Sequence, residues 1–217
     1  QWDVSNVTSM SNMFHTQAFN QDISMWNISS LTGDGMSGMF CNGSFNQPLN
    51  GWTIPAGVTS LENTFGRSVY DQPLDNWDVS GITNMRNMLT NAEFNQDISG
   101  WDVSSVINMS RMLYGSGTKF NQDITEWDTS SLETIADMCY QNTMFDQDLS
   151  NWSTTTSITI DGAFRESTFN QPLPNWKIDG SNYNSMRRAF QDNADFNQDI
   201  SEWDTSNVTN MSHIFIL

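Results

Sequence analysis

The sequence predicts an α/β solenoid of about nine coils, a single repeat domain over residues 1–217, with one short parallel strand and one short helical segment in each coil of about 25 residues. Three observations predict this fold. An eight-residue word recurs, as FNQDISMW at 19–26, FNQDISGW at 94–101 and FNQDISEW at 196–203. Successive tryptophans lie 24 to 27 residues apart. Finally, the spacing of apolar residues changes within every repeat.

The word has eight copies, and in each an aromatic residue precedes a tryptophan by seven positions. The pairs are Phe19 and Trp26, Phe45 and Trp52, Tyr70 and Trp77, Phe94 and Trp101, Phe120 and Trp127, Phe145 and Trp152, Phe169 and Trp176, and Phe196 and Trp203. A period of this length is typical of units that stack and bury one another's apolar side chains.

The predicted strand lies at the tryptophan of each repeat. An apolar or β-branched residue follows the tryptophan two positions later, as in Trp77 and Val79, so both side chains share one face of an extended segment. Such strands, all running in the same direction, would form a parallel sheet on one side of the stack.

The predicted helical segment follows. Ile82, Met85, Met88 and Leu89 have the spacing of one stripe of a short helix, with Ser80 as its N-cap. Methionine exchanges with leucine, isoleucine and alanine at these positions in other repeats, which indicates core packing rather than metal binding.

Glutamine occupies the third position of all eight words, after asparagine or aspartate. Coils stacked about 4.8 Å apart would place these identical amides above one another. We expect them to form a hydrogen-bonded ladder that satisfies an irregular backbone.

Aspartate or proline occupies the fourth position of the word. Turn formation is the favoured interpretation because both residues form turns and proline has no N–H to donate. The alternative is calcium binding between coils, and it is the only cofactor that the sequence suggests. The calcium candidates are Asp22, Asp97, Asp123, Asp148 and Asp199, whereas Pro48, Pro73 and Pro172 fill the position elsewhere.

A second series of aspartates follows the tryptophans directly. Its members are Asp3, Asp78, Asp102, Asp128 and Asp204. They are interpreted as solvated strand residues or, alternatively, as a polar face that binds a partner.

Net charge and composition exclude several classes of function. The formal charge of −17 argues against nucleic-acid binding, and no apolar run is long enough to insert into a membrane. An enzyme is not expected, because His15 and His213 would lie roughly 40 Å apart in a stack of coils and no carboxylate pair stands out.

Five sequons are candidates for N-glycosylation if the chain is secreted by a eukaryote. Their asparagines are Asn6, Asn42, Asn108, Asn207 and Asn210.

The composite repeat FNQDISxWDVSxVTxMxxMF resembles the 25-residue repeat of mycoplasma and other bacterial surface lipoproteins, relatives of the BspA-like leucine-rich-repeat surface antigens. The resemblance covers the whole chain. It implies a right-handed, leucine-rich-repeat-like solenoid at the cell surface, with adhesion as the function of some members and no catalytic residues.

The sequence therefore predicts a non-enzymatic extracellular surface protein that binds protein or glycan ligands over its solenoid surface. The alternative is a subunit or fragment of a filament that associates end to end, because the first and last repeats have no divergent polar cap.

Overall fold

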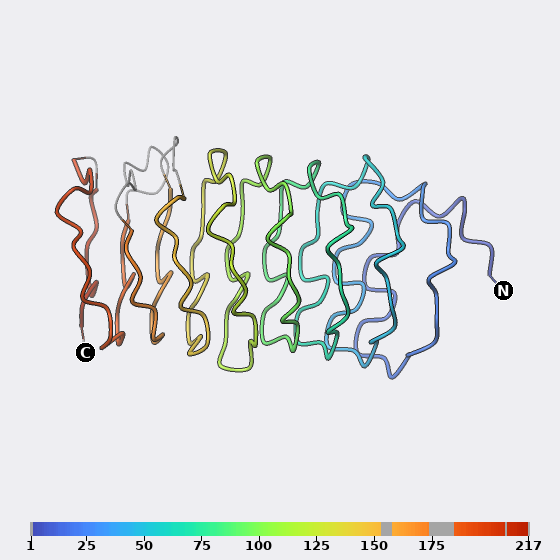
Figure 1. Cartoon of the computed structure of the whole chain (residues 1–217), viewed down its shortest axis with the longest axis horizontal. Coiled ribbons are helices and arrows are strands. Elements are labelled where there is room, and N and C mark those ends of the chain that lie inside the picture. The colour runs from blue at the N-terminus through green and yellow to red at the C-terminus, as the bar shows by residue number, and fades with distance from the viewer. Residues whose placement is uncertain (1, 153–157, 174–184, 207, 217) are drawn as a thin grey trace.

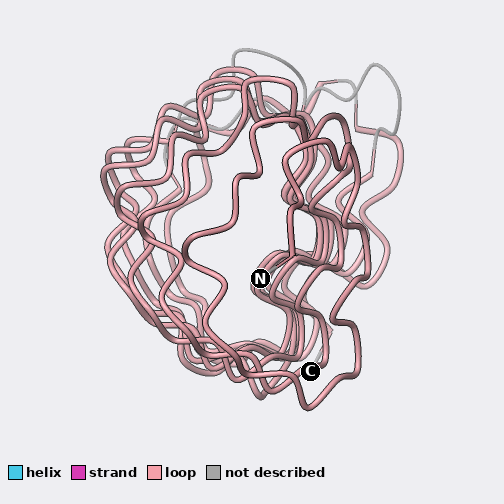
Figure 2. Ribbon diagram, turned by 90° about the vertical axis from the view of Figure 1, so that its right-hand side faces the viewer, coloured by secondary structure: helices cyan, strands magenta, loops and turns pink. Residues whose placement is uncertain are grey.

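The computed structural model describes residues 2–152, 158–173, 185–206 and 208–216. These residues form a stack of coils, with the N-terminus at one end of the long axis and the C-terminus at the other (Figure 1). Viewed along that axis, successive coils follow nearly the same closed path (Figure 2).

The expectation of an α/β, leucine-rich-repeat-like solenoid with a helix and a strand in every coil is wrong. The described residues contain no α-helix, and their only strand-like features are isolated parallel bridges without a continuous sheet. Loops and turns make up almost the whole of each coil (Figure 2).

Left-handed residues prevent the segment around Met85 from forming a helix. Asn87 and Asn91 have φ values of 56° and 48°, which no residue inside an α-helix adopts. Alternate backbone N–H groups, starting at Met85 and Asn87, donate to carbonyls of the next coil instead of along the chain. Met88 N–H donates to the Met85 carbonyl at 3.2 Å, which closes a turn.

The same two left-handed positions recur along the stack. Positive φ is found at Asn12, Gly38, Asn63, Asn87, Arg111, Asp137, Gly162, Arg188 and His213, and again at Thr16, Asn42, Arg67, Asn91, Gly115, Gln141, Glu166 and Asp192. The helix-like spacing of apolar residues therefore arises from consecutive turns, whose repeat of three to four residues is close to that of a helix.

The strand-like contacts also do not lie at the tryptophans, where the sequence predicted the strands. The residues around Trp77 and Val79 form turns, because Trp77 N–H donates to the Leu74 carbonyl and Ile82 N–H to the Val79 carbonyl. The parallel bridges lie six to nine residues after the tryptophans. They pair Gly33 with Val58, Ser60 with Asn84, Asn84 with Asn108, Asn108 with Thr134, Thr134 with Thr159, and Ser185 with Asn210.

Aromatic columns run through the core. The rings of Tyr70, Phe94 and Phe120 stack with centroids 6.3 Å apart at each step. A second column contains Phe40 and Phe65, 5.6 Å apart, and the two columns pack side by side. Each ring is thus buried by the coils on either side of it, which makes the stack the source of the hydrophobic stabilisation.

Side-chain hydrogen bonds join the coils where the backbone does not. Asn95 Oδ1 accepts the backbone N–H of Asn121 at 2.9 Å and the Nε2–H of Gln122 at 3.1 Å. We call this recurring arrangement the amide ladder, and it links unlike residues rather than glutamine to glutamine. Its acceptors are Asn20, Asn46, Asp71, Asn95, Asn121, Asp146 and Asn170.

The tryptophan indoles also form hydrogen bonds between neighbouring coils. Trp101 Nε1 donates to the Leu74 carbonyl of the preceding coil at 3.0 Å, and Trp127 Nε1 donates to the Ile98 carbonyl at 3.2 Å. A buried indole N–H needs an acceptor, and these carbonyls supply it. The tryptophan of each word is therefore both an apolar side chain of the core and a polar connection between coils.

Candidate functional site

Carboxylates gather on the surface of the middle coils. We call this surface the acidic ridge; it consists of Asp78, Asp102 and Asp128 in one column and Asp97, Asp123 and Asp148 in another. All six side chains are exposed. Each column takes one residue from each of three successive repeats, so the ridge extends along the stack.

An Asx turn positions each of these carboxylates. Asp97 Oδ1 accepts the backbone N–H of Ser99 at 2.9 Å, and Asp102 Oδ1 accepts the N–H of Ser104 at 3.0 Å. The sequence specifies this geometry locally, because an aspartate two residues before a serine or threonine satisfies a backbone donor at a turn. The same bond forms at the other four ridge positions.

These hydrogen bonds lower the pKa of several ridge aspartates. The hydroxyl and then the backbone N–H of Ser104 lower the pKa of Asp102, and the corresponding groups of Ser80 lower that of Asp78. For Asp97, the backbone N–H of Ser99 is the largest cause of the lower pKa. Hydrogen bonds that favour the charged form keep these groups ionised at physiological pH.

Neighbouring coils bring like charges together along each column. The charge of Asp78 acts on Asp102, and the charge of Asp123 acts on Asp97, in each case opposing the lowering of the pKa. In the described part of the chain, no ion pair involves a ridge residue; the three ion pairs join Arg86 to Glu62, Arg111 to Asp137, and Arg165 to Glu166. Among the residues that the structure describes, no cationic side chain therefore neutralises this negative surface.

The remaining aspartates of the two series lie outside the ridge but form the same turn. Asp3 and Asp22 accept hydrogen bonds from the backbone N–H groups of Ser5 and Ser24, and both aspartates are exposed. Asp199 and Asp204 accept those of Ser201 and Ser206. The structure thus places all ten predicted aspartates in Asx turns, but it brings only the middle six into continuous columns.

Calcium binding stays a prediction for Asp22, Asp97, Asp123, Asp148 and Asp199. In the ranges that the structure describes, no group of three or more histidine, cysteine, aspartate or glutamate side chains is arranged to hold a metal ion. Calcium takes six to eight oxygen ligands. In each of these five carboxylates, one oxygen already accepts the hydrogen bond of the turn.

The predicted glycosylation sites differ in exposure. Asn6 and Asn42 are exposed, whereas Asn108 and Asn210 are half-buried. Asn108 Oδ1 accepts the backbone N–H of Ser110 at 2.9 Å, and Asn210 makes the same contact with Ser212. Asn207 lies outside the described residues.

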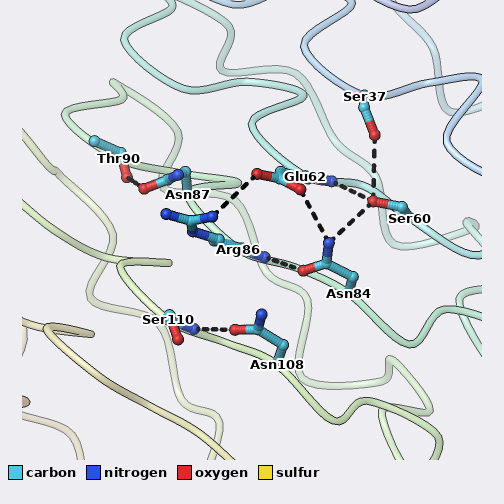
Figure 3. A network of polar contacts seen from close by, with 9 residues as sticks. All are labelled: Ser37, Ser60, Glu62, Asn84, Arg86, Asn87, Thr90, Asn108 and Ser110. Carbon is cyan, nitrogen blue, oxygen red and sulfur yellow. Dashed lines mark hydrogen bonds and ion pairs between the residues drawn. The ribbon is translucent and has the colours of Figure 1, made fainter. Parts of the chain in front are cut away.

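A separate polar network lies near the parallel bridges (Figure 3). Asn84 Nδ2 donates to Ser60 Oγ and to Glu62 Oε2, and Arg86 lies 3.8 Å from Glu62 Oε1. Sequence reasoning missed this surface and the arginines farther along it. Arg111 and Arg188 occupy the first left-handed position of their coils, whereas Arg86 and Arg187 precede it and Arg165 precedes the second, so no single sequence position identifies these arginines.

Further along the chain, the surface formed by the left-handed turns, which we call the turn face, carries a contact between an arginine and a tyrosine ring. The Arg165 guanidinium lies 4.6 Å from the centroid of the Tyr140 ring, and the Tyr140 and Tyr114 rings meet edge to face at 5.1 Å. This face of the stack is thus chemically unlike the acidic ridge.

No described helix is long and apolar enough to cross a membrane. Comparison with protein families gives a match to the family described as "Mycoplasma protein of unknown function, DUF285", over residues 1–70, 59–176 and 160–216. The searches of curated proteins and of solved structures each gave no match.

Proposed function

The chain belongs to the mycoplasma protein family DUF285, and from this premise we propose that it is a non-enzymatic module of an extracellular surface protein. In this proposal the stacked coils bind protein or glycan partners over their outer surface, in an adhesive or structural role. A relationship with the BspA-like surface antigens is part of the proposal, as is the location at the cell surface.

The acidic ridge is the observation that carries the proposal. Its six carboxylates are exposed, held in place by Asx turns and unpaired with any described cation. A fixed negative surface attracts a basic partner and selects against an acidic one. The partner class that fits the ridge best is therefore a protein surface rich in lysine or arginine.

Repetition strengthens such binding. The amide ladder and the indole hydrogen bonds fix each coil on the next, so the two columns present their charges at a constant spacing. A partner with several cations can contact several coils at once. After the first contact has formed, the others form within the same complex, which raises the overall affinity. Modest individual contacts would then give adhesion without a deep pocket.

The binding proposal is tested with an immobilised lysine-rich peptide. Replacing Asp78, Asp102 and Asp128 by asparagine retains the turns, because the amide Oδ1 still accepts the backbone N–H, and removes three charges from one column. We expect this triple variant to bind the peptide more weakly than the wild type does, and we expect its affinity to depend less on salt concentration.

A control with the same net charge separates the ridge from bulk acidity. It replaces Asp34, Asp192 and Asp195, which lie outside the ridge, by asparagine. Equal loss of binding in the two triple variants would reject the ridge as the binding surface. The surface location has its own test: an antibody against the chain should label intact cells of the source organism, and labelling only after lysis would overturn it.

End-to-end association is a second candidate. Trp2 is 70% exposed in the first described coil, and Phe215 is 52% exposed in the last. In the interior of the stack, the equivalent rings are covered by a neighbouring coil, so a second copy could cover these ends by the same contacts. Sedimentation that shows concentration-dependent oligomers, lost in Trp2→Ser, would support it; a monomer at all concentrations would contradict it.

A further inference from the structure

A pocket on the turn face gathers half of the chain's basic residues. Its charged lining consists of Arg111, Arg165, Arg187, Arg188, Asp137 and Asp161. The whole chain has only eight lysines and arginines against 25 aspartates and glutamates. Four arginines around one pocket are therefore contrary to the overall composition, and they make this part of an acidic protein locally basic.

Gly162 leaves space for the Asp137 side chain at the edge of the pocket. Arg111, Asp137, Gly162 and Arg188 occupy the same left-handed position in successive repeats, with φ values of 57°, 53°, 62° and 59°. Gly162 has no side chain to fill its place in this column, and a Cβ added there would contact Asp137 Oδ1. The Asp137 carboxylate thus occupies the space beside Gly162, and Asp137, Gly162 and Arg188 of this column line the pocket.

The two pocket carboxylates already have partners in the protein. Asp137 Oδ2 accepts hydrogen bonds from Arg111 Nε and Nη2 at 3.1 and 3.0 Å. Asp161 Oδ1 accepts the backbone N–H of Arg187 at 2.9 Å. Neither bond involves the guanidinium of Arg187 or Arg188, so these two cations are left to face the pocket.

The arginines retain unused donors. Arg165 is held by Glu166, at 2.7 Å, and by the face of the Tyr140 ring, yet its Nε is buried without a hydrogen-bond partner. The Nε of Arg188 is also buried without a partner. A buried N–H without an acceptor is costly, so two such donors beside one hollow indicate that a ligand supplies the acceptors.

We propose that this pocket binds a single tetrahedral oxyanion, a sulfate or phosphate group, with Arg165, Arg187 and Arg188 as its ligands. Guanidinium groups match such oxygens in geometry and donate charge-assisted hydrogen bonds to them. The net charge of −17 over the whole chain disfavours a long polyanion, whereas a compact anion stays within the local field of the arginines. The proposal is independent of the acidic ridge and of adhesion.

The test is an NMR titration of the isotopically labelled chain with sodium sulfate and with sodium phosphate, at an ionic strength held constant by sodium chloride. We expect saturable shifts of the amide signals of residues 161–165 and 185–188. Arg188→Gln should weaken binding by about tenfold, the loss expected for one charge-assisted hydrogen bond.

Two further variants keep the result independent of folding. Arg187 has an exposed side chain, so Arg187→Gln should leave the spectrum of the core unchanged and still weaken binding. Arg86→Gln, which removes an arginine that pairs with Glu62 outside the pocket, should bind as the wild type does. Shifts that chloride alone reproduces, or equal binding by the wild type and both pocket variants, would overturn the proposal.

The same titration distinguishes the source of the anion. A sulfated monosaccharide that binds more tightly than inorganic sulfate would assign the pocket to a glycan-borne group. Equal affinity would assign it to the free anion. Either result supports an oxyanion site, and binding of the unsulfated sugar with equal affinity would contradict it.

Discussion

Single side chains perform several distinct tasks in this chain. Aspartates of the two surface series close Asx turns, and asparagines at the second position of the word join neighbouring coils. Tryptophans fill the core with their rings and donate a hydrogen bond to a backbone carbonyl of the preceding coil. Most of these hydrogen bonds are local or join residues one repeat apart. The residue substituted at one position can therefore be compared with the residues that occur naturally at the same position in other repeats. The chain therefore contains its own control variants.

Tyr70 is the one tyrosine in a column of buried phenylalanines, and its hydroxyl has no hydrogen-bond partner. Burial raises the pKa of Tyr70 well above its usual value. We expect Tyr70→Phe to raise the free energy of unfolding by about 1 kcal/mol, because it removes an unsatisfied polar group. Urea denaturation measures the change.

The reciprocal variant Phe94→Tyr is the control, since it buries a second hydroxyl in the same column. It should lower the free energy of unfolding. A loss of stability in Tyr70→Phe would show that the Tyr70 hydroxyl has an acceptor and would contradict the interpretation.

The lowered pKa values of Asp78, Asp97 and Asp102 predict a pH dependence. A carboxyl whose pKa is lower in the folded state contributes stability above its unfolded pKa, near 3.8, and loses it as the pH falls through the folded value. The wild type should therefore lose stability below about pH 4 relative to a variant with asparagine at all three positions. Thermal melts at high salt, which screens charge repulsion, measure the difference.

A wild type that gained stability over the asparagine variant on acidification would contradict this account. In that case repulsion between the stacked carboxylates, which protonation removes, would exceed the effect of the turn hydrogen bonds.

At the scale of the element, the unit of structure is a run of consecutive turns rather than a helix. Asn87 adopts φ 56° and its N–H donates to the Ser110 carbonyl of the next coil. Asparagine and glycine adopt this conformation with little strain, whereas a β-branched residue does not. Asn87→Val should lower the free energy of unfolding by about 1–2 kcal/mol, and Asn87→Gly should have a much smaller effect. Equal effects in chemical denaturation would argue against a left-handed residue here.

The amide ladder is the second element. Asn95→Ala removes the acceptor of the Asn121 backbone N–H and one of the two acceptors of Gln122 Nε2, which keeps the Asn95 backbone carbonyl, so it should cost about 1–3 kcal/mol. Asn95→Asp should be tolerated, because Asp71 and Asp146 accept the same bonds in their coils. Calorimetry of both variants tests the ladder. An alanine variant as stable as the aspartate variant would show that water replaces the bonds.

Sequence reasoning located the repeating unit but misplaced its elements. Trp77 and Val79 have the spacing of a strand face and are buried in the core, yet tight turns flank them instead of a strand. Met85, Met88 and Leu89 have helical spacing because consecutive turns bury residues three and four apart. The discriminating signal was the asparagine, glycine or aspartate at the Asn87 position in six of nine repeats, which indicates left-handed backbone.

The candidate surfaces were predictable to different degrees. Exchange of aspartate with proline indicated turns at the fourth word position, and the hydrogen bonds of Asp97 and Asp123 have that geometry. The basic pocket was not predictable, because Arg111, Arg165 and Arg188 are distant in sequence. Only the position of the left-handed residues in each coil brings them together.

At the scale of the whole molecule, the coils are joined by the same contacts from one end to the other. Aromatic stacking, the amide ladder and alternate backbone hydrogen bonds all connect residues about one repeat apart. Stability is therefore expected to depend on interfaces between neighbours, as in other repeat proteins. The outer surface is left free to vary, which permits an acidic ridge and a basic pocket on one stack.

The most direct test of this architecture is a nuclear Overhauser spectrum of the labelled chain in solution. The account predicts contacts from the Phe94 ring to the rings of Tyr70 and Phe120, and from the Asn95 side chain to the amide proton of Asn121. Continuous amide-to-amide contacts of a helix over residues 82–89, without contacts between residues one repeat apart, would contradict it.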